Sequence, residues 1–249
     1  MIPQKKSKLD DFIAFANEML YEKKSELDVD ALSKEAKKIE SYSYVDSKLA
    51  FGMIAALKFD ELEVKKQFEA AMRASGGETK VIRNYSSALF NIHKPISAVN
   101  MIEEAVRAEP DSITILLDAL DVYLKAQNVE GAINTVKKLS KLGHKIKKEE
   151  QDRIDDLSRL FALSGANWED NAKRIELVGS KMHDFGFRLR HTDEIFTDEG
   201  IIYQFVLDST IDEALDAQTN ILDTLSELPY LPSDNMLSFS CVPYECNPS

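Results

Sequence analysis

Small and apolar residues return every 34 positions through the first two-thirds of the chain. Val64, Phe68 and Ala71 are spaced four and then three residues apart, so they share one face of a helix. The same face returns twice, as Ala98, Ile102 and Ala105 and then as Ala132, Val136 and Leu139. Aligned residues come before each face: Phe51, Gly52 and Ala55, then Tyr85, Ser86 and Leu89, then Ala119, Leu120 and Tyr123. The pattern predicts three helical hairpins over residues 45–146.

These hairpins resemble the tetratricopeptide repeat, a helix–turn–helix unit of 34 residues, with units beginning at Val45, Thr79 and Ile113. The matching positions are small residues in both helices, then an aromatic residue, an alanine and a proline: Gly52, Ser86, Ala98, Ala132, Phe68, Ala71, Ala105 and Pro110. The sequence departs from the family at Leu120, Leu139, Gly76 and His144. The departures predict less regular packing in the third unit.

A stack of three hairpins needs a polar cap at each end. The N-terminal cap is expected at residues 1–44, with one helix over 8–24 (Phe12, Ile13, Phe15, Met19 and Leu20) and a second near 28–41. The other cap is expected at residues 147–166. There Ile154, Leu157, Leu160 and Phe161 form one stripe, and Gly165 ends the helix.

The spacing of apolar residues changes in residues 167–249. The new pattern predicts a small α+β domain in the order α-β-β-α-β. Asn167 can cap a helix that runs to about Phe185. Two strands follow at 187–196 and 201–207, joined by a hairpin turn in which Gly200 is expected to supply a positive φ. A helix at 210–228 and a strand at 236–242 complete a mostly antiparallel sheet. The inward stripe expected for that helix is Ile211, Ala214, Leu215, Gln218, Ile221, Leu222 and Leu225.

The fold class that follows is mainly α, a helical-hairpin array followed by a small α+β domain. The net charge of −12 is concentrated in the second part: residues 167–249 hold 5 Lys and Arg against 16 Asp and Glu, a net of −11. This balance argues against nucleic acid as a partner and leaves a basic protein open. No apolar run approaches the roughly 18 residues of a membrane span, the N-terminus lacks a signal-peptide pattern, and two cysteines fit a reducing compartment. A cytoplasmic protein is expected.

The resemblance to tetratricopeptide repeats implies a concave groove lined by the first helix of each pair. Carried over to this sequence, the first unit offers Asp46, Leu49, Ala50 and Met53. The next two units offer the candidate groove residues Lys80, Arg83, Asn84, Ser87, Asn91, Asp118, Asp121 and Lys125, with Thr114 and Leu117 beside them. The acids of the third unit argue against a clamp for a terminal carboxylate, while Lys80, Arg83 and Asn84 could bind one acidic group or a backbone.

Signals for catalysis are weak. The chain has no glycine-rich phosphate loop and no Cys-x-x-Cys pair, and Cys241 fits a strand residue better than a nucleophile. His183 and Asp184, followed by His191 and Asp193, are the best candidates for a metal or acid–base site, but no third ligand stands at a diagnostic spacing. No catalytic residue, cofactor or metal is therefore predicted. An enzyme with a site near His183 and His191 is kept as an alternative.

The leading hypothesis is a non-catalytic protein that binds a protein or peptide, through the groove, the acidic domain or both. The acidic candidates share the outer face of the helix at 210–228: Asp212, Glu213, Asp216, Asp223 and Glu227. An immunity protein or antitoxin that neutralises a basic toxin such as a nuclease is a sharper form of it, drawn by analogy. A basic run, Lys137, Lys138, Lys141, Lys145, Lys147 and Lys148, could instead dock against the acidic domain, either within one chain or between the copies of a homo-oligomer.

Overall fold

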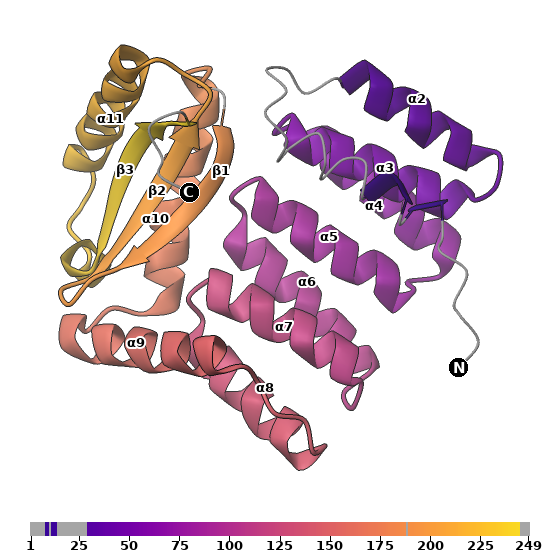
Figure 1. Ribbon diagram of the computed structural model, residues 1–249, viewed down its shortest axis with the longest axis horizontal. Helices are drawn as coiled ribbons and strands as arrows, with labels where there is room; N and C mark the ends of the chain where they lie inside the picture. The colour runs from indigo at the N-terminus through magenta and orange to yellow at the C-terminus, as the bar shows by residue number, and fades with distance from the viewer. Residues whose placement is uncertain (1–7, 10, 14–28, 188, 245–249) are drawn as a thin grey trace. The chain divides into compact units, whose positions relative to one another are not determined.

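The structure is a computed structural model that describes residues 8–9, 11–13, 29–187 and 189–244. The fold is mainly helical with one small sheet near the C-terminus, as predicted (Figure 1). The chain divides into two compact units. The first comprises residues 1–92 and 100–110, and the second comprises residues 93–99 and 111–249. The boundary predicted near Gly165 is not where this division falls, because α9 and α10 pack with other elements of the second unit.

The first unit contains α2 (Val29–Glu40), α3 (Tyr44–Leu57), α4 (Glu61–Ser75), α5 (Thr79–Asn91) and most of α6 (Pro95–Ala108). Ser43 and Asp60 cap α3 and α4 by accepting backbone N–H groups, and Gly76 ends α4 in a left-handed conformation. Gly52 lets α3 approach α4 closely, because a Cβ added there would lie 2.5 Å from the Phe68 ring. The glycine and the ring therefore set how closely the two helices of the first pair approach.

The second unit contains α7 (Ile113–Lys125), α8 (Val129–Lys141), α9 (Lys148–Ser164), α10 (Trp168–Asp184) and α11 (Ile211–Ser226). In this unit, Gly131 of α8 lies against the Tyr123 ring of α7. A Cβ added at Gly131 would lie 2.7 Å from that ring. Gly165 ends α9 with φ +68° and Asn167 caps α10, both as expected. The six helices predicted over residues 45–146 are confirmed.

The turn inside each hairpin places a residue other than glycine in the left-handed region. These residues are Phe59, His93 and Gln127, with φ of 55°, 57° and 59°, and they stand 34 positions apart. A positive φ is uncommon for side chains of this size and costs free energy, so its return at one spacing marks one repeated backbone geometry. Phe59 is half-buried, whereas His93 and Gln127 are buried within the second unit.

The sheet has the order β1-β2-β3, formed by β1 (Leu189–Phe196), β2 (Ile201–Leu207) and β3 (Leu237–Pro243). β1 and β2 are antiparallel, but β2 and β3 are parallel, so the sheet is mixed and the prediction of a mostly antiparallel sheet is wrong. The reason is that α11 carries the chain back across the sheet between β2 and β3. Gly200 does not have a positive φ. It fits because a Cβ there would lie 2.4 Å from the carbonyl oxygen of Met236.

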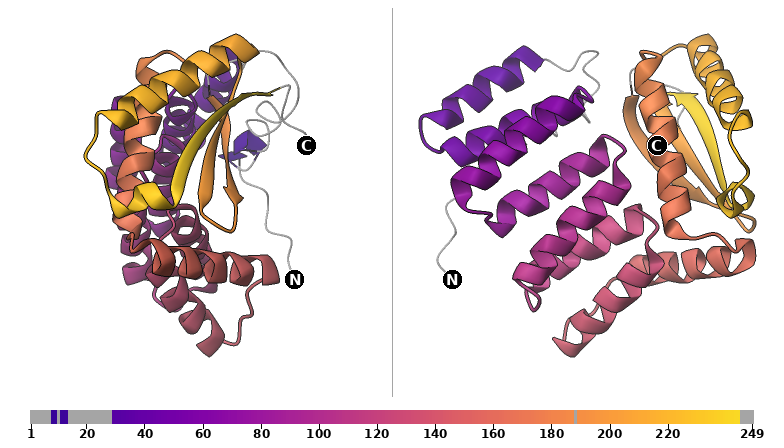
Figure 2. Two further views of the ribbon diagram at one scale, coloured as in Figure 1. Left: turned by 90° about the vertical axis from the view of Figure 1, so that its left-hand side faces the viewer. Right: turned by 180° about the vertical axis from the view of Figure 1, so that it is seen from behind.

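The helices α10 and α11 contact each other, and α11 packs beside β3 (Figures 1 and 2). Ala172, Ile175, Val178 and Met182 of α10 are buried, whereas Phe185, directly after the helix, is exposed. The buried Arg174 guanidinium on α10 donates to both carboxylate oxygens of Asp234 at 2.9 and 2.8 Å and to the Pro229 carbonyl at 2.5 Å. It thereby fastens the segment that links α11 to β3, including the 3-10 helix η1 (Pro232–Asn235).

The predicted N-terminal cap is described in part. Its second helix is α2, close to the predicted 28–41. Residues 8–9 and 11–13 are helical, with Leu9 and Phe12 buried, and Phe15, Met19 and Leu20 lie outside the described residues. No helix in the part of the chain that the structure describes is long and apolar enough to span a membrane.

Candidate partner-binding surfaces

The outer side of α11 carries apolar residues that the periodicity assigned to the core. Thr210 and Glu213 form a capping box that starts the helix. Ala214, Ala217 and Ile221 are the residues that the helix buries. Ile211, Leu215 and Leu222 are 59, 59 and 55% exposed, so the predicted inward position is wrong for these three. The physical reason is that the helix packs through two alanines, whose small side chains bring only a narrow strip of its surface against the core.

The acidic row predicted on α11 is on the surface: Asp212, Glu213, Asp216, Asp223 and Glu227 are all exposed. At 100° per residue, Asp212, Asp216 and Asp223 lie together on the side of the helix next to the exposed apolar residues. The Glu213 carboxylate accepts from the backbone N–H and the hydroxyl of Thr210, and these hydrogen bonds lower its pKa. One side of α11 is thus an apolar stripe, Ile211, Leu215 and Leu222, bordered by an acidic row.

The groove candidates of the first unit lie on α5, where several bond within the protein. Lys80 Nζ is 3.0 Å from the Asp46 carboxylate on α3, and both residues hold the same position in adjacent repeats. Asn84 donates from its amide to the Lys80 carbonyl, and Ser87 donates to the Arg83 carbonyl. Ser87 and Asn91 are exposed. The repeat pattern therefore brings equivalent residues of α3 and α5 onto one face, as the groove hypothesis requires.

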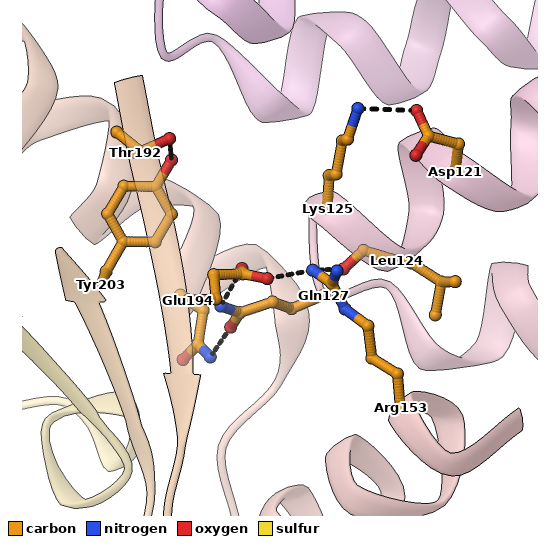
Figure 3. A network of polar contacts seen from close by, with 9 residues as sticks. Asp121, Leu124, Lys125, Gln127, Arg153, Thr192, Glu194 and Tyr203 are labelled. Atoms are coloured by element: carbon orange, nitrogen blue, oxygen red, sulfur yellow. Dashed lines mark hydrogen bonds and ion pairs between the residues drawn. The ribbon is translucent and has the colours of Figure 1, made fainter. Parts of the chain in front are cut away.

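The groove candidates of the second unit lie on α7 next to a buried polar network (Figure 3). Lys125 and Asp121 are exposed and form an ion pair of 2.8 Å within the helix, while Asp118 is half-buried. The α7–α8 turn follows directly, and its residue Gln127 donates to the Glu194 carboxylate on β1 at 3.0 Å. The three candidates therefore lie on the part of α7 that leads into the polar network.

Glu194 is the charged centre of this network. Arg153 of α9 pairs with it and also donates to the Leu124 carbonyl, while Asn171 of α10 donates to Gln127 at 2.6 Å. Burial raises the pKa of Glu194, and Arg153 and Gln127 oppose that shift by favouring the carboxylate. The sequence analysis missed these residues. Because removing one partner would leave a buried charge uncompensated, the network holds β1, α9 and the α7–α8 turn together.

His93 occupies the equivalent turn of the second repeat and is also buried. Its ring meets Phe205 and Tyr203 edge-on, with centroids 5.5 and 6.4 Å apart. Gly179 of α10 provides the space, since a Cβ there would lie 2.5 Å from His93. Burial lowers the His93 pKa to about 4, so the neutral imidazole is the form that packs against the sheet. The spacing of 34 residues is the sequence signal that could have linked His93 with Gln127.

The residues of the enzyme alternative lie on two elements. His183 is exposed in the last turn of α10, and His191 of β1 lies 3.4 Å from the Asp193 carboxylate. Among the residues that the structure describes, no three His, Cys, Asp or Glu side chains gather in a way that could hold a metal ion. Cys241 is half-buried in β3, and burial raises its pKa to about 12, so the thiol form dominates at neutral pH.

Comparisons of this chain with known protein families, with characterised proteins and with solved structures find no match. Of the predicted sites, the α11 side combines apolar area, charge and exposure on one rigid element, a combination typical of protein interfaces.

Proposed function

We propose that this protein is a non-catalytic protein-binding protein and that the outer side of α11 is its main binding surface. The observation that carries the proposal is the apolar stripe of Ile211, Leu215 and Leu222, more than half exposed, next to the acidic row. Apolar side chains provide affinity when they are desolvated, and the charges around them choose the partner and speed the encounter. A partner with a basic surface around an apolar patch fits this arrangement. A basic nuclease toxin would be one such partner.

We also propose that residues 45–146 are tetratricopeptide repeats that carry this surface. The support is the left-handed turn residue at Phe59, His93 and Gln127 and the six helices around these turns. The groove candidates of α5, among them Arg83 and Asn84, form a second candidate surface for the same partner. The Lys80–Asp46 pair across equivalent repeat positions favours it.

The test is a capture of partners from the native host with the tagged full chain. The double variant Asp212→Lys and Asp216→Lys should slow association and weaken the salt dependence of binding, because exposed charges mainly steer the encounter. The matched control reverses two exposed acids on other helices, Glu104→Lys and Asp152→Lys, and should bind like the original chain. Stability should change by no more than about 0.5 kcal/mol in either variant.

The groove makes the opposite prediction. If the partner binds along α5, Arg83→Ala and Asn84→Ala should abolish capture, and the reversals on α11 should be neutral. If the original chain, the α11 double variant and the two groove variants all capture the partner equally, neither surface is the binding site.

A further inference from the structure

The strand β3 lies at an edge of the sheet, and its alternate residues point their backbone groups in opposite directions. The carbonyl of Met236 accepts from Ile201 at 2.6 Å, and β3 then runs parallel to β2 from Leu237 to Pro243. Because backbone direction alternates along a strand, the N–H and C=O groups of Leu237, Phe239 and Cys241 point away from β2. Pro243, which has no N–H, continues this outward series.

A side chain of α11 bonds with the outward groups of β3. The Gln218 amide donates to the Phe239 carbonyl at 3.1 Å, and its oxygen accepts from the Cys241 N–H at 2.9 Å. An adjacent parallel strand would offer one donor and one acceptor to the same two residues. Gln218 therefore stands in for the backbone N–H and C=O of one residue of a parallel fourth strand.

The apolar stripe begins next to Gln218. At 100° per residue, Gln218 follows the buried Ala214 and Ile221 around the helix, and Ile211, Leu222 and Leu215 come next on the same side. Since Gln218 reaches the edge of β3, the stripe extends beyond that edge on the side away from the core. A fourth strand paired with β3 would be covered by this stripe, as β3 is covered by the buried side of α11.

We propose that an extended segment of a basic partner adds to the β3 edge as a fourth strand and displaces the Gln218 amide. Its backbone pairs with Leu237, Phe239 and Cys241, and its alternate apolar side chains pack under Ile211, Leu215 and Leu222. This inference rests on the proposed function and adds how the partner binds. The outward part of β3 spans about five residues, or roughly 17 Å at 3.3 Å per residue.

Charge selects a basic segment over a second copy of this chain. Residues 167–249 carry a net charge of −11, and Asp212, Asp216 and Asp223 border the stripe. Two copies paired through β3 would bring these acidic rows together, which like-charge repulsion opposes. A segment rich in lysine or arginine is instead attracted by the net negative charge of residues 167–249.

The probe is a labelled heptapeptide, Lys-Val-Lys-Val-Lys-Val-Lys, titrated with the full chain and followed by fluorescence anisotropy. Its valines share one side of an extended strand, as the stripe requires. We expect saturable binding that Leu215→Asp weakens at least tenfold. The matched control is Leu163→Asp, because Leu163 is an exposed leucine on α9 with 72% exposure. It should leave binding unchanged.

Backbone pairing is tested at Gln218 and in the peptide. Gln218→Ala should speed hydrogen exchange of the Cys241 amide in the free chain and tighten peptide binding severalfold, because no amide has to be displaced. Gln218→Glu keeps an acceptor for the Cys241 N–H and should slow that exchange relative to Gln218→Ala. Bound peptide should protect the Cys241 amide in all of these chains. A peptide with proline at its central position should bind at least tenfold more weakly.

The outcomes separate the two proposals. If the proline peptide binds equally well, or the Cys241 amide gains no protection, strand addition is overturned. The α11 surface then still stands if Asp212→Lys with Asp216→Lys weakens capture of the native partner. If the heptapeptide does not bind at all, strand addition is also overturned. If Gln218→Ala instead makes the chain dimerise through β3 and exclude the peptide, the occupant is a second copy and the proposal fails.

Discussion

The first and third helix pairs place their large and small side chains in opposite helices. In the first pair, Gly52 of α3 faces Phe68 of α4. In the third pair, Leu120 of α7 and Val136 of α8 hold those two repeat positions, and the glycine that contacts a ring is Gly131 of α8. The large residue has moved from the second helix to the first. The contact between two helices is therefore specified by a sum of volumes more than by one residue type at one position.

The third pair forms two continuous helices although its sequence departs from the repeat pattern. Leu120 and Leu139 are fully buried, and α7 and α8 run without interruption from Ile113 to Lys125 and from Val129 to Lys141. That the third unit packs less regularly than the first stays a prediction. The turns differ in another way, since Phe59 is half-buried while Gln127 hydrogen-bonds to two other elements.

The largest effect on stability is expected from replacing Gly52, the glycine of the first pair, with a larger residue. Gly52→Leu should lower the free energy of unfolding by about 3 kcal/mol or more, because even a Cβ would lie 2.5 Å from the Phe68 ring. Urea unfolding followed by circular dichroism measures the change. The double variant Gly52→Leu with Phe68→Val copies the third pair and should recover at least half of the loss. Recovery will be incomplete because Phe68 also stacks on Tyr85 at 4.9 Å. Additive losses in the double variant would break the comparison.

A loss of similar size is expected from acid, through the turn of the second repeat. His93 has a pKa of about 4 in the folded chain against about 6.5 unfolded. Above pH 6.5 both states are neutral and stability is complete. Between pH 6.5 and 4 only the unfolded chain gains the proton, so stability falls by about 3 kcal/mol and then levels off.

The measurement is chemical unfolding of the full chain at several pH values, compared with His93→Gln. The substitution abolishes this titration along with the ring contacts, so the pH-dependent part of the difference between the two chains should disappear as the pH falls through this window. The buried Tyr203 hydroxyl does not contribute, because burial raises its pKa further above its ordinary value. A constant difference between pH 7 and 4 would show that His93 accepts a proton in the folded chain.

A smaller effect on stability is expected to distinguish the turn of the third repeat from the turn of the first. Gln127→Gly should cost about 1–2 kcal/mol, because the buried Glu194 and Asn171 lose a partner while the left-handed backbone is relieved. Phe59→Gly, the matched change in the first turn, should stay within about 1 kcal/mol. Thermal unfolding of both variants measures the contrast. Equal losses would mean that the turn geometry, rather than its buried contacts, sets the stability.

The sequence predicted the elements well because periodicity reports which residues share a face. The 34-residue repeat located six helices, and the change of period after Gly165 located the two strands on either side of Thr197–Gly200 and the helix α11. Periodicity could not show which face another element covers. Ile211, Leu215 and Leu222 have the spacing of a core stripe, yet Ala214 and Ala217 are the side chains that let α11 approach.

The site residues were predicted less completely, because their roles depend on distant parts of the chain. The acidic row could be predicted, since charge at helical spacing marks a solvated face. Gln218 was assigned to the core stripe, and nothing local indicates that its amide reaches Phe239 and Cys241 on β3. Glu194 likewise gains its partners from α9 and from the α7–α8 turn.

The mixed sheet imposes an order on folding. The β1–β2 hairpin closes through Thr197–Gly200, a local contact that forms fast, whereas β3 can join only after α11 has crossed back. During that interval Ile201–Leu207, the most apolar strand of the chain, has one unpaired edge. In the folded chain the hydrogen bonds of Arg174 to Asp234 and Pro229 hold the segment before β3 in place. A newly made chain is therefore most exposed to misassembly between the completion of its hairpin and the arrival of its last strand.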